Sequence, residues 1–313
     1  MDFMKKRMPC VIVAAFTLIM ILVFSLIKGG KVEGDGDGRL SVTATTTMLY
    51  DLVKQIGGDH VIAQGLMGSG IDPHQYRASA KDIVKMQTAD VVVYNGLHLE
   101  GKMGDVLASL EKSGRTVICV SDNIPEDRLI INDGVPDPHI WFDVSLWRLA
   151  AAEVAEGLSS ADPVNSKEYK SNLEIYQKQL DQLENYILSK TAEIPEGQRV
   201  LITAHDAFGY FGKAYGFEVK GLQGISTVAE AGTSDVGRLA EYIAENRIKA
   251  VYVESSMPVK NIEALREAVK ARGFETCLGG SLYSDSTGDE KSGTQSYIGS
   301  FKSNIDAIAE GLL

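Results

Sequence analysis

Residues 163–192 read PVNSKEYKSNLEIYQKQLDQLENYILSKTA, and they separate two halves of the chain. Apolar side chains recur here at spacings of 4, 3, 4, 3 and 4: Tyr169, Leu173, Tyr176, Leu180, Leu183 and Ile187. This spacing lines one face of an α-helix of about 28 residues, about 42 Å long at ~1.5 Å per residue. We expect a stiff connecting helix over residues 162–194 that packs against both halves. A dimeric coiled coil along the same stripe is the alternative.

The two halves share one pattern, in which short β-rich runs alternate with helical stretches. The first half has expected strands at residues 40–45, 61–66, 90–94 and 116–120, and helices that include 79–88 and 102–112. The second half has expected strands at 199–203, 217–222, 250–254 and 274–278, and helices at 207–215, 234–246, 259–272 and near 297–312. This alternation is typical of parallel sheets with crossover helices. We therefore predict an α/β fold with two βα lobes, residues 40–161 and 195–313, whose parallel four-stranded sheets are joined by the long connecting helix.

The N-terminus has the pattern of an export signal. Lys5, Lys6 and Arg7 precede residues 11–27, which carry no charged side chain. The basic segment before such an apolar run stays on the cytoplasmic side, so the rest of the chain is expected outside the cytoplasm. Residues 1–28 are then a cleaved signal peptide or an uncleaved N-terminal anchor, and the glycine-rich residues 29–39 are a flexible linker. We expect an exported protein, either periplasmic or anchored to the outer face of the cytoplasmic membrane.

The composition is that of an ordinary globular protein. Hydrophobic residues make up 44% and charged residues 23% of the 313 residues, which excludes a disordered or collagen-like chain. The formal net charge of −11 argues against nucleic acid as a partner, because phosphates attract basic surfaces. Three cysteines cannot form a disulfide framework. Cys119 and Cys277 lie in strand-like runs, and we expect both to be buried free thiols.

Three of the five histidines stand in contexts that suit metal ligands. His74 and His139 each follow Asp-Pro, whose restricted backbone forces a turn and presents the imidazole from a rigid loop. His205 stands at the end of an expected strand, and Asp285 follows another strand by a short loop. Ligands of open α/β sheets gather at the C-terminal ends of strands. If the lobes face each other there, His74, His139, His205 and Asp285 form a cage of three nitrogens and one carboxylate.

Residues beside these motifs carry weaker predictions. Asp72 and Asp137 are either acceptors for the second ring nitrogen of the neighbouring histidine or simple turn formers. Glu254 ends an expected strand, and it is either an acceptor for a ligand histidine or a helix-capping acid. Trp141 and Phe142 are expected to pack beneath their loop rather than to touch a metal.

Taken together, these stretches resemble a known family. Five segments, in chain order, look like the cluster A-I solute-binding proteins of metal ABC importers, and in particular the TroA-type zinc/manganese binders: LMGSGIDPHQY (66–76), NGLHLE (95–100), DPHIW (137–141), TAHDAF (203–208) and YVESS (252–256). The resemblance covers nearly the whole chain from about residue 40. It implies two βα lobes joined by one long helix, with a metal ion held between them by His74, His139, His205 and Asp285. It also implies a membrane permease and its ATPase as partners.

The donor set bears on the choice of metal. Three imidazoles and one carboxylate suit Zn²⁺ better than Mn²⁺, which prefers more oxygen ligands, although a bidentate Asp285 would accommodate Mn²⁺. In this family, manganese binders commonly have Glu where this chain has His205. Many zinc binders have a histidine-rich loop, whereas residues 121–136 contain no histidine. We expect Zn²⁺ as the main metal and Mn²⁺ as a second one.

Three functions fit such a site. The first is a capture protein that binds the metal, docks on a permease and releases it there; we expect it to be a monomer and not an enzyme. The second is a zinc-dependent hydrolase, which needs an open coordination position and a general base. The sequence contains no His-Glu-x-x-His motif, and four protein ligands close the site, so we predict no catalytic residues. The third is a surface adhesin built on the same scaffold, and the sequence contains no motif that supports it.

Overall fold

The computed structural model describes residues 38–313, of which residues 40–313 form one compact unit. The predicted signal peptide or anchor, residues 1–28, and all but the last two residues of the predicted linker lie outside the described residues. Within residues 38–313, no helix combines the length and the apolar character that crossing a membrane requires.

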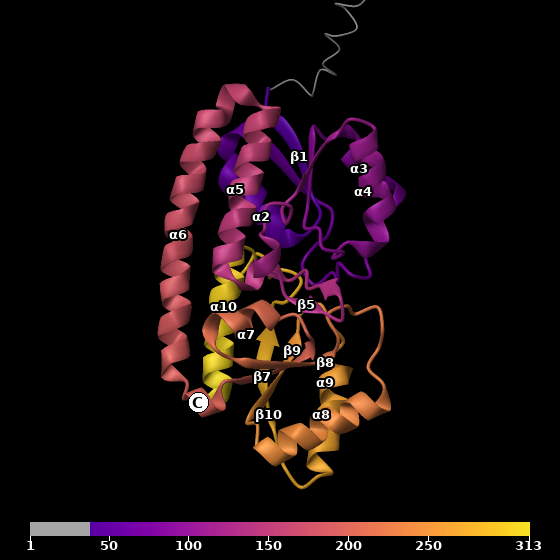
Figure 1. Ribbon diagram of the computed structural model, residues 1–313, viewed down its shortest axis with the longest axis vertical. Helices are drawn as coiled ribbons and strands as arrows, with labels where there is room; N and C mark the ends of the chain where they lie inside the picture. The colour runs from indigo at the N-terminus through magenta and orange to yellow at the C-terminus, as the bar shows by residue number, and fades with distance from the viewer. Residues whose placement is uncertain (1–37) are drawn as a thin grey trace, which may run out of the picture. The chain divides into compact units, whose positions relative to one another are not determined.

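The first half contains a four-stranded parallel sheet, as predicted. Its strands β1 (Leu40–Ala44), β2 (Val61–Gly65), β3 (Val91–Tyr94) and β4 (Thr116–Cys119) lie in the order β2-β1-β3-β4. The crossover helices are α2 (Thr47–Gly57), α3 (Ala80–Thr88) and α4 (Gly104–Lys112) (Figure 1). Ser79 and Asp82 start α3 with a reciprocal capping box, which satisfies two backbone donors at the helix N-terminus. Helix α5 (Val144–Ala161) follows the sheet in the chain.

One long helix, α6 (Ser166–Glu193), joins the halves and is preceded by a short 3₁₀ turn, η5 (Pro163–Asn165). Five members of the predicted stripe are buried and Leu173 is partly buried: Tyr169, Tyr176, Leu180, Leu183 and Ile187. The helix packs against α2, α5 and the C-terminal helix α10 (Tyr297–Leu312), beside which it runs in Figure 1. The stripe is therefore covered by the same chain, which leaves no apolar seam for the coiled-coil alternative.

The second half contains two parallel pairs of strands. Strand β7 (Val200–His205) pairs with β8 (Glu218–Gln223), and β9 (Ala250–Glu254) pairs with β10 (Cys277–Leu282). Strands β7 and β9 contact each other without a ladder, so the four parallel strands lie as two adjacent pairs. The helices of this half are α7 (Gly209–Tyr215), α8 (Thr233–Asn246), α9 (Lys260–Lys270) and α10. The α/β fold with parallel sheets and one long helix is confirmed, but the four-stranded sheet predicted for the second half is divided into two pairs, because β7 and β9 form no ladder.

Strand β10 differs from the prediction, which placed a strand at residues 274–278. It starts three residues later and runs on to Leu282, with a shift in register between Leu278 and Ser281. The glycines at 279 and 280 explain the irregularity: a Cβ on Gly279 would lie 2.4 Å from the ring of Tyr252, and Gly280 has a φ of +122°. The prediction for Cys277 is wrong as well, since this thiol is exposed, whereas Cys119 is buried as expected.

Candidate metal centre

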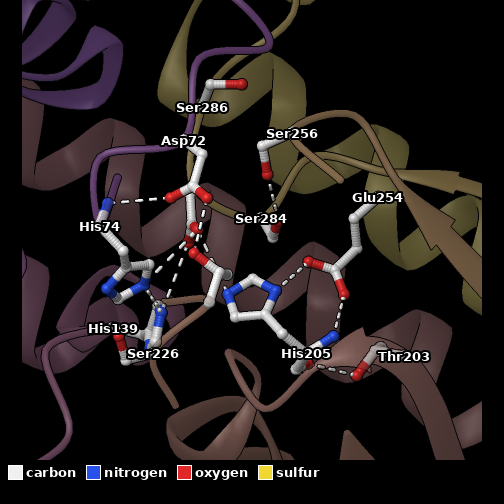
Figure 2. Close-up of polar contacts among 12 residues, drawn as sticks. Asp72, His74, His139, Thr203, His205, Ser226, Glu254, Ser256, Ser284 and Ser286 are labelled. Atoms are coloured by element: carbon white, nitrogen blue, oxygen red, sulfur yellow. Dashed lines mark hydrogen bonds and ion pairs between the residues drawn. The ribbon is translucent and has the colours of Figure 1, made fainter. Parts of the chain in front are cut away.

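Loops and strand ends from both halves present the four predicted ligands. His74 lies in the loop after β2, and His139 immediately precedes the short helix η4 (Ile140–Phe142). His205 is the last residue of β7, and Asp285 follows β10 by a short loop. The structure brings these four side chains together, because the C-terminal ends of the strands in both halves meet at one place. Figure 2 shows the three histidines of the group.

The two Asp-Pro-His tripeptides fold into the same turn. Asp72 Oδ1 accepts the backbone N–H of His74 at 2.9 Å, and Asp137 Oδ1 accepts that of His139 at 2.9 Å. The intervening proline has a fixed φ and no N–H, so the aspartate side chain closes the turn on the histidine. The repeated motif therefore holds each imidazole at the tip of a rigid loop.

The donor atoms of the four side chains converge. One donor atom from each residue lies within 4.8 Å of all the others. His74 Nε2 is 3.3 Å from His139 Nε2. The carboxylate of Asp285 lies 3.7 Å from His74 Nε2, 3.4 Å from His139 Nε2 and 3.2 Å from His205 Nε2. Three imidazole nitrogens thus face one carboxylate across a space the size of a single ion.

This cluster is shielded from solvent, since none of its four side chains is more than 3% exposed. Both oxygens of Asp285 are buried and accept no hydrogen bond of normal geometry from the described residues. A buried carboxylate is costly unless positive charge faces it, and a metal ion among the three nitrogens would supply that charge. The donor set and its burial therefore fit a divalent metal ion.

Two acidic residues contact the far side of the imidazole rings. Asp137 Oδ1 lies 2.7 Å from His139 Nδ1, and Glu254 Oε2 lies 2.5 Å from His205 Nδ1. The Asp137 contact is a hydrogen bond and the Glu254 contact is a short ion pair; a carboxylate at Nδ1 favours the tautomer in which Nε2 carries the free lone pair, and it orients the ring. Both carboxylates therefore direct the Nε2 atoms toward the centre of the cluster.

Asp72 makes a different set of contacts. Its Oδ1 accepts the backbone N–H of His74 rather than binding the ring, and its Oδ2 accepts the hydroxyl of Thr227 at 2.6 Å. Gln75 Nε2 donates to Asp72 Oδ2 at 3.1 Å and to the carbonyl of Thr227 at 3.3 Å. Asp72 thus links the His74 loop to a loop of the second half, a contact between distant segments that the sequence did not indicate.

Burial and charge act differently on the three histidines. Burial, reinforced by the other two histidines and opposed by Asp285, lowers the pKa of His74 to about 4. Burial also opposes charge on His139, but Asp137 and Asp285 outweigh it and raise the pKa of His139 to about 9. For His205, the attraction of Glu254 and Asp285 overcomes burial and raises its pKa well above the ordinary value. Burial would raise the pKa of Asp285, but the histidines hold it well below its usual range.

A further layer of residues supports the His139 loop, and motif reading did not assign them. Asn95 Nδ2 donates to the carbonyl of Pro138 at 3.0 Å, and Tyr210 donates its hydroxyl proton to the carbonyl of Asp137 at 3.0 Å. The buried Glu100 accepts the backbone N–H of Asn95 at 2.8 Å. Asn95 and Glu100 are the first and last residues of the NGLHLE stretch. The resemblance of this stretch to the family was the sequence signal that could have pointed to them.

The other two described histidines lie outside the cluster. His98 is exposed, with a positive φ of 65°. His60 is half-buried and its ring meets the edge of Tyr169. Neither belongs to the group of side chains that could hold an ion.

Comparison with known proteins shows the family of this chain. The family model described as "Zinc-uptake complex component A periplasmic" matches residues 42–311. The chain belongs to this family. It is 45% identical over 310 residues to the zinc-binding protein TroA of Treponema pallidum, covering 99% of both chains. It is 44% identical over 278 residues to the manganese-binding lipoprotein MntA of Bacillus subtilis, covering 88% of this chain and 90% of that one.

The fold of this family member is also that of a solved structure. The periplasmic zinc-binding protein TroA from Treponema pallidum superposes with a TM-score of 0.86 at 46% identity, covering 88% of this chain and 99% of that chain. Family membership confirms the predicted resemblance and the predicted class, since the family is described as a periplasmic component of a zinc-uptake complex. The family is one of transport components, and the hydrolase alternative is not favoured.

Proposed function

We propose that this protein captures one divalent metal ion outside the cytoplasm and delivers it to a membrane permease that works with an ATPase. The observation that carries the proposal is the buried cluster of three imidazole nitrogens around the carboxylate of Asp285. The metal is the cargo of the protein, held between a first lobe of residues 40–161 and a second lobe of residues 195–313, with residues 162–194 as the connection between them.

In this proposal, His74, His139, His205 and Asp285 bind the metal directly. Asp137 and Glu254 orient the rings of His139 and His205 from behind, at 2.7 and 2.5 Å from their Nδ1 atoms. Asp72 acts on His74 through its backbone N–H and through Thr227. Since metal-binding histidines usually donate their second N–H to such acceptors, this arrangement supports a metal site rather than a structural polar cluster.

Zn²⁺ is the main cargo in this proposal, and Mn²⁺ is the second. Three nitrogens and one carboxylate match the tetrahedral preference of Zn²⁺, and a bidentate Asp285 would supply the extra oxygen that suits Mn²⁺. The relatives support both metals, since TroA is named a zinc-binding protein and MntA a manganese-binding lipoprotein. Affinity for divalent ions follows the Irving–Williams order, so supply in the organism decides which metal is loaded.

The partners follow from the same proposal. The protein acts as a monomer that docks on the permease of a metal ABC importer, and it uses no catalytic residues. Export by residues 1–28 would place it in the periplasm or on the outer face of the cytoplasmic membrane. Four protein ligands leave no free position for a reacting water, and this supports capture over zinc-dependent hydrolysis.

Metal content tests the proposal. The protein would be purified without chelator and without an affinity-tag histidine run, and its metals would be measured by elemental mass spectrometry. Competition titrations of the stripped protein with Zn²⁺ and Mn²⁺ would follow. We expect about one equivalent of zinc or manganese, lost in His139→Ala. A stripped protein that takes up neither ion would contradict the proposal.

A further inference from the structure

Trp141 contacts both sides of the cluster. It lies in η4, two residues after His139, and it is 2% exposed. Its indole Nε1 donates to the carbonyl oxygen of Ser284 at 2.9 Å, and Ser284 immediately precedes Asp285. Its ring also meets the ring of His139 edge-on, with centroids 5.2 Å apart. One side chain thus touches a ligand from the first half and the peptide that carries the ligand from the second half.

Other contacts hold the far side of the same peptide segment. The backbone N–H of Gly70 donates to Ser286 Oγ at 2.9 Å, and Ser69 Oγ donates to the carbonyl of Thr287 at 2.8 Å. The backbone N–H of Thr287 donates to Thr47 Oγ1 at 2.8 Å. These three bonds follow Asp285 in the chain, whereas the Trp141 bond precedes it. Residues 284–287 are therefore tied to the first half on both sides of the carboxylate.

Trp141 is itself fixed in place. Its backbone carbonyl accepts the hydroxyl proton of Tyr297 at 2.7 Å, and the backbone N–H of Tyr297 donates to Asp51 Oδ2 at 2.9 Å. Both aromatic residues are buried. With its backbone held and its ring packed, the indole N–H has one direction available, toward Ser284.

We propose that Trp141 is a positioning residue for metal binding, whose indole N–H sets the separation between His139 and Asp285. This inference rests on the proposed function. Metal–ligand distances allow little variation, so the Asp285 loop and the His139 loop must keep a constant spacing. The Trp141–Ser284 bond spans these loops directly beside both ligands, at a buried point where an unpaired carbonyl is costly. Without it, the segment that carries Asp285 relaxes away from the three histidines.

The second tryptophan of this chain, Trp147, provides a matched control. Trp147 is fully buried, and its Nε1 donates to the hydroxyl of Tyr176 at 3.0 Å, which joins α5 to α6. Trp141→Phe and Trp147→Phe each remove one buried indole N–H and keep an aromatic ring. Only the first substitution removes a bond that spans the ligand loops.

The test compares these two variants with the wild-type protein by Zn²⁺ competition titration and by the visible spectrum of bound Co²⁺, which reports coordination geometry. We expect Trp141→Phe to weaken Zn²⁺ binding about tenfold or more, the scale of losses around metal sites, and to change the Co²⁺ spectrum. Trp147→Phe should match the wild type in both. Equal behaviour of the two variants in both measurements would overturn the inference. A wild-type protein that binds no metal would remove the proposed function, and the inference with it.

A second measurement uses the wild-type protein, so its result does not depend on whether Trp141→Phe folds. Wild-type protein labelled with ¹⁵N shows the indole N–H resonances, which Trp147→Phe assigns to the two tryptophans. One equivalent of diamagnetic Zn²⁺ should shift the Trp141 resonance and leave that of Trp147 in place. A Trp141 resonance that does not respond to the ion would also overturn the inference.

Discussion

Glu254 contacts His205 at two points, the backbone and the ring. Glu254 Oε1 accepts the backbone N–H of His205 at 2.8 Å, while Oε2 lies 2.5 Å from His205 Nδ1. Both residues are buried, and they end the neighbouring strands β9 and β7. A single carboxylate therefore fixes the end of the strand and the orientation of the imidazole, whose Nε2 lies 3.2 Å from Asp285.

Glu254→Gln should weaken metal binding. The amide keeps the shape of the side chain, but it has one acceptor oxygen where His205 needs two, so either the backbone N–H or Nδ1 loses its partner. We expect the Kd for Zn²⁺ to rise about 10- to 100-fold, as is typical when a partner of a ligand histidine is lost. The measurement is a chelator competition titration, with the exposed Glu263→Gln as control. Equal affinities in the two variants would contradict the orienting contact.

Replacing a ligand histidine should also weaken metal binding. His139→Ala and His205→Ala each remove one of four donors. We expect each to lower Zn²⁺ affinity by more than about tenfold, because replacing even a residue that only hydrogen-bonds a metal ligand has an effect of that size. His98→Ala changes an exposed histidine outside the cluster and should bind as the wild type does. Unchanged stoichiometry and affinity in both ligand variants would show that these residues do not bind the metal.

The identity of residue 205 should influence metal preference. His205→Glu exchanges an imidazole nitrogen for carboxylate oxygens, which suit Mn²⁺ better than Zn²⁺. We expect the ratio of Zn²⁺ to Mn²⁺ affinity to fall in this variant. Titrations with both ions on the same stripped preparation measure that ratio. If the ratio matches that of the wild type, ligand chemistry at this position does not set selectivity.

Acid should weaken metal binding, because protons and the metal compete for the imidazoles. The pKa of His139 is raised to about 9, so below that pH the metal must displace the proton on Nε2. The Kd should therefore rise as the pH falls from about 9, and more steeply below about 4, where His74 also becomes protonated. Proton release on adding Zn²⁺ at pH 7, recorded with a pH-stat, checks this directly. Binding at pH 7 without proton release would contradict it.

The stability of the metal-free protein should depend on pH in the opposite sense: it should fall as the pH rises above neutral. A raised pKa means that charged His139 stabilises the folded state below its unfolded value of about 6.5, and that this stabilisation is lost as the pH rises through about 9. His139→Gln should reduce that loss. Thermal unfolding of both stripped proteins between pH 6.5 and pH 9 provides the comparison, and parallel curves would argue against the shift.

The connecting helix should contribute strongly to stability. Leu180 is fully buried between α6 and its neighbours, so Leu180→Ala should lower the free energy of unfolding by about 2–5 kcal/mol. Leu188 in the same helix is 48% exposed, and Leu188→Ala should cost about 0.5 kcal/mol or less. Urea unfolding of the stripped proteins measures both. Similar losses in the two variants would mean that the buried stripe does not hold the halves together.

Sequence reasoning predicted the fold well where the signal is local. The period of the α6 stripe and the alternation of strands and helices in the first half depend on residues near one another in the chain, so they could be read directly. Helices α2 and α5 are not among the helices that the prediction named, and both pack between the sheet and α6. The start of β10 was missed because the contact of Gly279 with Tyr252, on the neighbouring strand, sets its register.

The sequence by itself determined the donor types and the turns that present them. An Asp-Pro-His tripeptide closes on its own aspartate, and this local geometry follows from proline stereochemistry and short-range hydrogen bonding. Only the tertiary structure decided which acceptor serves which ring: Asp137 binds the ring of its own histidine, Asp72 binds Thr227 instead, and Glu254 binds His205 across two strands. The bond from Trp141 to Ser284 belongs to the same class. Apart from the Asp137–His139 pair, these contacts join segments far apart in the chain, and packing of the whole domain, rather than any local preference, sets the distances between them.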